Sequence, residues 1–190
     1  MLGNHRAFPY YVVYEQNLCT NLNFYPCKYY SYKKINTNII MIQYIKNRSI
    51  FDSKCEVITN PVNCVGVMGG GLAAAFKKKF PKMFNDYLKL CSSQELIPGR
   101  CALWDDKTSE YKVLLFPTKD HWRFATRNWF VAGGLRYFVA HYKDWGIKSI
   151  AFPALGCGLG GLDWEDVKFL MEEELKSVKD ELDIEIYIPQ

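Results

Sequence analysis

The sequence predicts a single α/β domain in which helices cover both faces of a mixed sheet of about six strands. Short segments typical of strands recur along the 190-residue chain, and amphipathic segments with helical periodicity separate them. Strands and helices that alternate in this order form a three-layer α/β/α structure around a largely buried sheet. The length allows one ordinary domain, and 49% of the residues are hydrophobic, which is enough for a full core.

Six segments carry the strand signal: residues 41–46, 56–59, 101–104, 112–116, 149–153 and 184–188. The first and the last alternate between apolar and polar side chains, whereas the others are short apolar runs. Pro117 closes the fourth strand because proline cannot donate to a sheet ladder. Asn60 and Pro61 are predicted to form a turn directly after the second strand.

Four amphipathic segments are predicted as helices: residues 72–80, 83–91, 131–142 and 164–178. In each segment apolar side chains recur at intervals of three or four residues, so they share one helix face. Gly146 is predicted to end the third helix.

Residues 1–40 differ from the rest of the chain, because they are rich in Asn and Tyr and show no apolar periodicity. We predict a domain of residues 41–190 that begins naturally at Met41. Residues 1–40 are then an extension that is poorly ordered or absent from the native protein, with a partner-binding arm as the alternative. The extension holds +3 of the net charge of +4, so the charge of the remainder does not indicate a polyanionic partner. A local basic patch is formed by Lys77, Lys78, Lys79 and Lys82, and a solvated helix face is its simpler explanation.

Two glycine-rich loops each lie between a predicted strand and a predicted helix. The first contains Gly69, Gly70 and Gly71, and the second spans residues 156–161. Glycine has no Cβ to keep a phosphate from the backbone, so such loops present bare N–H groups to an anion. The second loop also matches the G-x-G-x-x-G dinucleotide fingerprint, but that motif normally opens a fold and here precedes the last strand. We therefore predict one site that grips a diphosphate from two sides, with two tight structural turns as the alternative.

Three motifs follow one another along the chain: NPVNCVGVMGGGLAAAF (residues 60–76), FPTKDHWR (116–123) and PALGCGLGGLDW (153–164). In this order the chain resembles the macrodomains, most closely the DNA ADP-ribosyl glycohydrolases that serve as antitoxins to DNA-modifying ADP-ribosyltransferases. The resemblance covers about residues 41–189 and implies a macrodomain fold with a pocket for ADP-ribose. The ligand-binding residues that it implies are Ser49, Ile50, Asn63, Gly69, Gly70, Gly71, Leu72, Thr118, Gly156, Cys157, Gly158, Leu159, Gly160 and Gly161.

Lys119 is the residue to which the resemblance assigns catalysis, because the FPTK-type lysine is catalytic in the DNA-glycohydrolase branch. A lysine at a predicted strand end can act as a point charge on phosphate. With a lowered pKa it can instead attack the anomeric carbon or its open-chain aldehyde. A surface lysine that balances Asp120 is the structural alternative. Asp120, His121 and Asp163 are candidate proton-transfer partners.

Five other residues have expected roles at the site. The resemblance implies that Asn63, the second candidate catalytic residue, contacts the distal ribose near its reactive carbon; an Asn that satisfies its own turn is the alternative. Trp122 and Arg123 are candidates for stacking on a nucleobase or holding a strand phosphate, and a Trp that packs the loop onto the domain is the alternative. Most macrodomains have an Asp near position 49 that binds the adenine amino group, and we expect Ser49 or the Ile50 backbone to serve here.

The seven cysteines are odd in number and include no C-x-x-C pair. This argues against a disulfide framework or a zinc site and favours a reducing, cytoplasmic compartment. No apolar run is long enough to cross a bilayer, so no membrane association is expected. We also expect no metal, no cofactor and a monomeric protein.

The preferred function is a hydrolase that removes ADP-ribosyl groups from a modified macromolecule, with DNA bases first among the acceptors. A non-catalytic reader of ADP-ribose is one alternative. A phosphatase of ADP-ribose 1''-phosphate, using the same pocket with an activated water, is another. A nicotinamide-dinucleotide enzyme that uses the second glycine loop is a more distant one.

Overall fold

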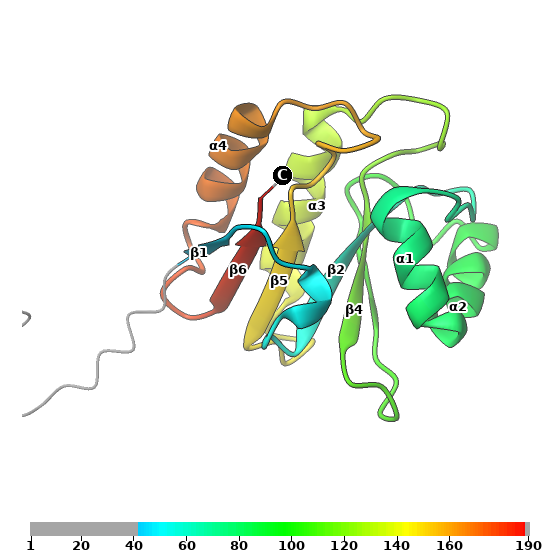
Figure 1. Cartoon of the computed structure of the whole chain (residues 1–190), viewed down its shortest axis with the longest axis horizontal. Coiled ribbons are helices and arrows are strands. Elements are labelled where there is room, and N and C mark those ends of the chain that lie inside the picture. Colours follow the sequence, from blue (N-terminus) through cyan, green and yellow to red (C-terminus); the bar gives the residue numbers. More distant parts are fainter. Residues whose placement is uncertain (1–41, 189–190) are drawn as a thin grey trace, which may run out of the picture. The chain divides into compact units, whose positions relative to one another are not determined.

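In the computed structural model, which describes residues 42–188, strands and helices follow one another in the order that the sequence predicts (Figure 1). The strands are β1 (Ile42–Ile45), β2 (Val57–Val62), β3 (Ala102–Trp104), β4 (Lys112–Pro117), β5 (Ser149–Pro153) and β6 (Asp183–Tyr187). The helices are α1 (Gly71–Lys79), α2 (Pro81–Ser92), α3 (Asn128–His141) and α4 (Trp164–Leu175), with a short 3-10 helix η1 (Ile50–Asp52). The predicted extension of residues 1–40 and the first residue of the predicted strand 41–46 lie outside the described residues.

The sheet has the strand order β1-β6-β5-β2-β4-β3. All neighbouring pairs are parallel except β3 and β4, which are antiparallel. The sheet is therefore mixed, with an antiparallel edge strand on an otherwise parallel core. Because most strands run the same way, β2, β4, β5 and β6 all end at the same edge of the sheet.

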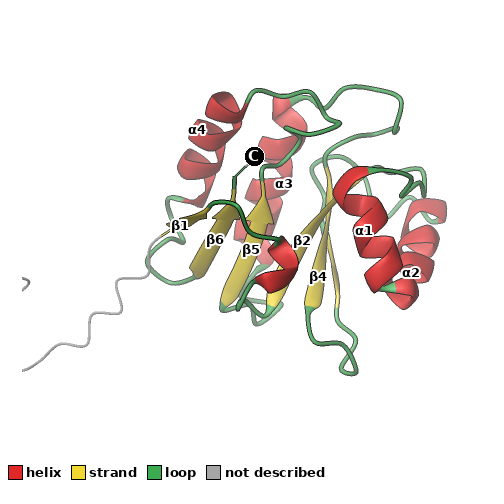
Figure 2. Cartoon of the chain, viewed as in Figure 1, coloured by secondary structure: helices red, strands yellow, loops and turns green. Residues whose placement is uncertain are grey.

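Helices pack on both faces of this sheet, which confirms the predicted three-layer architecture (Figure 2). Successive residues of β4 show the division, since Leu114 belongs to the apolar cluster under α3 and α4 and Leu115 to the cluster under α1 and α2. Phe138 and Met171 fill the first cluster from α3 and α4, and both are fully buried. A sheet covered on both faces explains why its central strands read as uniformly apolar runs.

The turn predicted at Asn60 and Pro61 is wrong, because β2 continues to Val62. Pro61 pairs in register with Phe116 of β4, whereas the pairing of β2 with β5 covers Val57 and Ile58 alone. The missing N–H of Pro61 therefore interrupts no bond to β5. This extension carries the end of β2 beyond the paired part of β5, to the edge where the glycine loops lie.

Helix ends also depart slightly from the predicted boundaries. α1 and α2 are separated only by Phe80, and Pro81 begins α2 at the position where proline is best tolerated. α3 ends at His141 rather than at Gly146, which instead has a φ of +66° in the turn that follows. Within residues 42–188 no helix combines the length and the apolar character needed to span a membrane.

Candidate functional site

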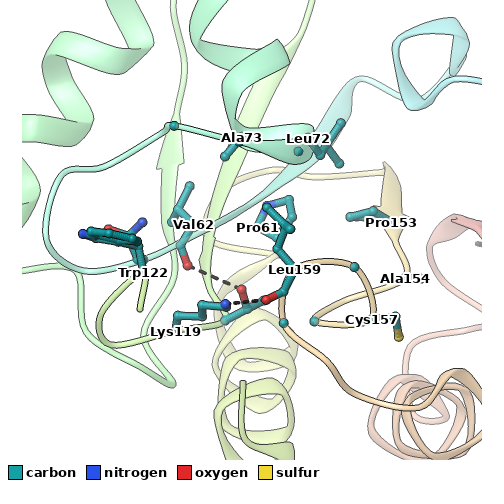
Figure 3. Close-up of a pocket in the computed structure, with 18 of the residues that line it drawn as sticks. Pro61, Val62, Leu72, Ala73, Lys119, Trp122, Pro153, Ala154, Cys157 and Leu159 are labelled. Carbon is teal, nitrogen blue, oxygen red and sulfur yellow. Dashed lines mark hydrogen bonds between the residues drawn. The ribbon is translucent and has the colours of Figure 1, made fainter. Parts of the chain in front are cut away.

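A pocket of about 890 Å³ opens at the edge of the sheet where the parallel strands end (Figure 3). Its floor includes Pro61 and Val62 of β2, Pro153 of β5 and Tyr187 of β6. The carboxyl ends of parallel strands are the usual place for ligands in α/β sheets. The two glycine loops and the segment after β4 form its walls.

The structure brings most of the predicted site residues together around this pocket. Those that line it are Asn63, Gly69, Gly70, Gly71, Leu72, Thr118, Lys119, Gly156, Cys157, Gly158, Leu159 and Gly160. Ser49, Ile50 and Gly161 do not line it. Segments separated by up to about a hundred residues in the sequence therefore share one cavity.

The first glycine loop delivers the N-terminus of α1 to the pocket. Gly70 is the N-cap and makes no side-chain capping bond, while Gly71 begins the helix with a φ of +54°. The first N–H groups of an α-helix have no partner inside the helix, and Gly71, Leu72 and Ala73 all line the pocket. These donors and the positive end of the helix dipole favour an anion at this wall.

The second glycine loop is shaped by close backbone contacts. A Cβ on Gly160 would lie 2.2 Å from the Gly156 carbonyl oxygen and 2.4 Å from Thr126 Oγ1. Gly156 has a φ of +76°, and the Thr126 N–H donates to the Gly160 carbonyl at 2.9 Å. Glycine is therefore required at these positions by the loop itself, and the loop is held against the segment before α3.

Asn63 is buried, and its side chain organises the turn between β2 and the first glycine loop. Its Oδ1 accepts from the N–H groups of Val65 and Val67 and from the Tyr87 hydroxyl, at 3.1, 3.2 and 3.0 Å. Its Nδ2 donates to the Val67 carbonyl. Asn63 therefore satisfies its own turn, which was the structural alternative for this residue. An amide has a second N–H donor, and since Asn63 also lines the pocket, that donor can serve a ligand hydroxyl.

Lys119 lies at the mouth of the pocket, directly after β4, and reaches across to the second glycine loop (Figure 3). Its Nζ donates to the Leu159 carbonyl at 2.6 Å. No ion pair of Lys119 is found within residues 42–188, so the alternative of a surface lysine that balances Asp120 does not describe its geometry. Its ammonium group is thus held at the wall of a pocket that favours an anion.

The three candidate proton-transfer partners are placed differently. Asp163 caps α4 by accepting from the N–H groups of Glu165 and Asp166. His121 Nδ1 accepts from the Arg123 N–H. Asp120 lines a separate, smaller pocket beside the main one. In the part of the chain that the structure describes, none of the three is hydrogen-bonded to Lys119 Nζ.

Cys157 is the thiol that lines the pocket. Burial and the nearby Asp163 raise the pKa of this thiol to about 11. A thiolate is the nucleophilic form of cysteine, so Cys157 is poorly suited to nucleophilic attack near neutral pH.

A comparison with protein families matches the Macro domain over residues 59–171. The chain belongs to the Macro domain family. The match contains the end of β2, both glycine loops and Lys119, and so most of the pocket lining, whereas Tyr187 and Ile188 lie beyond it.

Relatives of this macrodomain include a DNA ADP-ribosyl transferase-DNA ADP-ribosyl glycohydrolase fusion protein of Thermosipho africanus. It is 36% identical over 173 residues, which are 82% of this chain and 43% of that protein. The macrodomain of Mycobacterium tuberculosis DarG is a similar solved structure, with a TM-score of 0.75, 36% identity, and coverage of 79% of this chain and 99% of that one. Thermosipho africanus DarTG in complex with ADP-ribose gives a TM-score of 0.73 at 38% identity, over 79% of this chain and 42% of that one. The chain spans 38% to 43% of the length of the curated DNA ADP-ribosyl glycohydrolases it matches.

Ser49 and Ile50, expected at the adenine end of a macrodomain site, lie at η1 outside the pocket lining. Ser49 caps η1 by accepting from the Phe51 N–H, and Ile50 is 4% exposed in the apolar cluster under α1 and α2. Sequence reasoning did not foresee η1, because a helix of three residues has no periodicity to detect.

Several residues that line the macrodomain pocket were not foreseen from the sequence. They are Pro61, Val62, Val67, Ala73, Pro153, Ala154, Tyr187 and Ile188. Many of these apolar residues lie at or just beyond the ends of predicted strands. The rule that ligands bind at the carboxyl ends of parallel strands would have identified the strand ends, although not the side chains that face the cavity.

Proposed function

We propose that this macrodomain is a hydrolase that removes ADP-ribose from a modified macromolecule, with DNA bases first among the acceptors. The observation that carries the proposal is Lys119, whose Nζ lies at the pocket mouth, 2.6 Å from the Leu159 carbonyl of the second glycine loop. The relatives at 34% to 38% identity are named for DNA ADP-ribosyl glycohydrolase activity, and one solved structure contains ADP-ribose.

The two glycine loops support a position for the diphosphate. The N-terminus of α1 offers backbone donors and a positive dipole end from one side, and the loop at residues 156–160 faces it. In this arrangement we expect the distal ribose in the part of the pocket that Asn63 and Lys119 line. We expect the free Nδ2 donor of Asn63 to hold a ribose hydroxyl there.

Lys119 is the proposed nucleophile. In its uncharged form, Nζ adds to the anomeric carbon of the distal ribose, and the bond from that carbon to the acceptor base breaks. The electron pair leaves with the base, which takes up the proton that the attacking amine gives up. One water then adds to the carbon and passes a proton to the nitrogen, the carbon–nitrogen bond breaks, and ADP-ribose leaves while the lysine amine is restored.

The test uses the full chain and a DNA oligonucleotide that carries one ADP-ribosylated base. Wild-type protein should release ADP-ribose, and Lys119→Ala should lower the rate at least about 10²-fold, as expected for loss of one positioned catalytic group. Lys148→Ala, which removes an exposed lysine on the turn before β5, is the matched control and should be unaffected. Full activity in Lys119→Ala would refute the assigned role.

The alternatives give different results in the same experiment. A reader would bind ADP-ribose without releasing it from any acceptor. A phosphatase of ADP-ribose 1''-phosphate would release inorganic phosphate, and Lys119→Ala would leave that release unchanged. A nicotinamide-dinucleotide enzyme would bind NAD more tightly than ADP-ribose.

We propose an antitoxin-like, monomeric protein of a reducing cytoplasm, and the five cysteines within residues 42–188 are free thiols in support. The mass in solution from light scattering tests the monomer. Rescue of cells that express a DNA-modifying ADP-ribosyltransferase tests the antitoxin role.

A further inference from the structure

A second pocket, of about 420 Å³, lies beside the first and is not used in the proposed reaction. It is formed between the turn at Ile97 and Pro98 and the segment that leads from β4 into α3 (yellow-green in Figure 1). Asp120, Phe124, Arg127 and Trp129 line it. The lining thus combines aromatic rings with one carboxylate and one guanidinium.

Three large aromatic side chains around this pocket are exposed to solvent. Trp122, Phe124 and Trp129, which we call the aromatic ledge, are 47%, 64% and 59% exposed. They fall within eight residues of one another, whereas scattered single apolar residues are the norm on protein surfaces. They are not members of the two core clusters, and their ring contacts are with His121 and Phe130 of the same segment.

Neighbouring residues of one segment line the two pockets. Lys119 and Trp122 line the first pocket, and Asp120 lines the second. Consecutive Cα atoms are about 3.8 Å apart, so the two openings lie on either side of one short segment. A polymer attached to a distal ribose beside Lys119 therefore has the aromatic ledge within reach, because Trp122 lines the same pocket.

Two arginines in this segment are available to a phosphate. The Arg123 guanidinium lies 4.9 Å from the centre of the Trp122 ring, and that of Arg127 lies 5.9 Å from the centre of the Phe130 ring. Neither forms an ion pair with another residue of 42–188.

The basic patch on α1 and α2 is partly neutralised by carboxylates, and Lys78 is its one member with neither an ion pair nor an aromatic contact within residues 42–188. Lys79 pairs with Glu110 and Lys82 with Asp106, while the Lys77 Nζ lies 4.0 Å from the centre of the Phe84 ring. That patch fits a solvated helix face.

We propose that the aromatic ledge and the second pocket bind the single-stranded DNA that flanks the modified base. The proposal rests on the proposed function. Unstacked bases stack on Trp122, Phe124 and Trp129, a neighbouring base enters the second pocket, and Arg123 and Arg127 hold the phosphates between them. A single strand fits because bases in a duplex are stacked and cannot lie on aromatic side chains.

The test compares two substrates of the full chain, an ADP-ribosylated oligonucleotide and the corresponding ADP-ribosylated mononucleoside. Phe124→Ala and Trp129→Ala should lower kcat/KM on the oligonucleotide about tenfold and leave the mononucleoside unchanged. Unchanged affinity for ADP-ribose by calorimetry shows that each variant is folded. The matched control is Phe169→Ala, since Phe169 of α4 is 67% exposed and lies outside both pockets.

A binding measurement keeps this proposal separate from the reaction. Fluorescence anisotropy with an unmodified single-stranded oligonucleotide should show weaker binding by Phe124→Ala and Trp129→Ala. Arg127→Ala should lower the dependence of log affinity on log salt by roughly 0.7, as for one phosphate contact with a single strand. Loss of strand binding in the variants would support DNA binding by the ledge. Failure of the wild type to release ADP-ribose would overturn the proposed reaction and leave that binding result intact. Equal binding by all variants, tighter binding of duplex, or a dimer held through the ledge would overturn the proposal.

Discussion

Gly160→Ala should disrupt the second glycine loop, and the effect can be estimated from the contacts of that residue. The added Cβ would lie 2.2 Å from the Gly156 carbonyl oxygen, where real Cβ contacts essentially never fall below 3.0 Å. The backbone must therefore move by about 0.8 Å, the difference between these two distances. Overpacking of this kind costs about 1–3 kcal/mol. At about 2–4 °C per kcal/mol for a domain of this size, Tm should fall by roughly 2–12 °C.

The same displacement should weaken ligand binding, because the loop at residues 156–160 forms one wall of the pocket. Calorimetry with ADP-ribose should show a loss of affinity of at least about tenfold. Gly158→Ala is the matched control, since a Cβ there meets nothing within 4 Å and its Tm should be unchanged. A Gly160→Ala variant with the Tm and the ADP-ribose affinity of the wild type would refute the steric argument.

Three further predictions follow from other parts of the structure. Tyr87→Phe removes the hydroxyl that donates to the Asn63 carbonyl and Oδ1, and should cost about 1–2 kcal/mol in chemical denaturation while lowering kcat/KM. Burial raises the pKa of the Cys157 thiol to about 11, so the folded state keeps a proton that the unfolded chain loses near pH 9. Stability should therefore be fully present below about pH 9 and fall as pH rises towards 11, a trend that Cys157→Ser should reduce in denaturation at several pH values. A fragment of residues 41–190 should bind ADP-ribose as tightly as the full chain in calorimetry, and a weaker fragment would contradict the predicted boundary.

The fold could be predicted largely because each element has a periodic or punctuated signal. The uniform apolar run of β4 indicated a strand buried on both faces, and the structure shows its residues divided between two apolar clusters. The error at Pro61 has a clear physical origin. Proline cannot donate a hydrogen bond to the strand on one side. At Pro61 no such bond is needed, because the pairing of β2 with β5 covers only Val57 and Ile58, and the sequence alone does not reveal where that pairing ends.

The site was predictable to a different extent. The two glycine loops and Lys119 stand out as local patterns, so their residues could be named before their arrangement was known. Tyr187 and Ile188 carry no such signal, because they line the pocket only through the position of β6 beside β5. The aromatic ledge was predictable only in part. Trp122 is a candidate from the sequence, whereas Phe124 and Trp129 become candidates only because the structure exposes them to solvent.

The contacts between the two glycine loops bear on how a ligand enters. Leu159 is 77% exposed, yet its Cδ1 lies 3.1 Å from the position of a Cβ on Gly70, and its carbonyl accepts from Lys119. One residue of the second loop thus contacts both the first loop and the proposed nucleophile. A diphosphate between the loops would accept hydrogen bonds from the N–H groups at the start of α1. It would not offer the Leu159 side chain an apolar contact in place of the one with Gly70. Displacement of the Leu159 side chain by a ligand would move the loop that carries the acceptor of Lys119, so the position of this loop couples the anion wall to the proposed nucleophile.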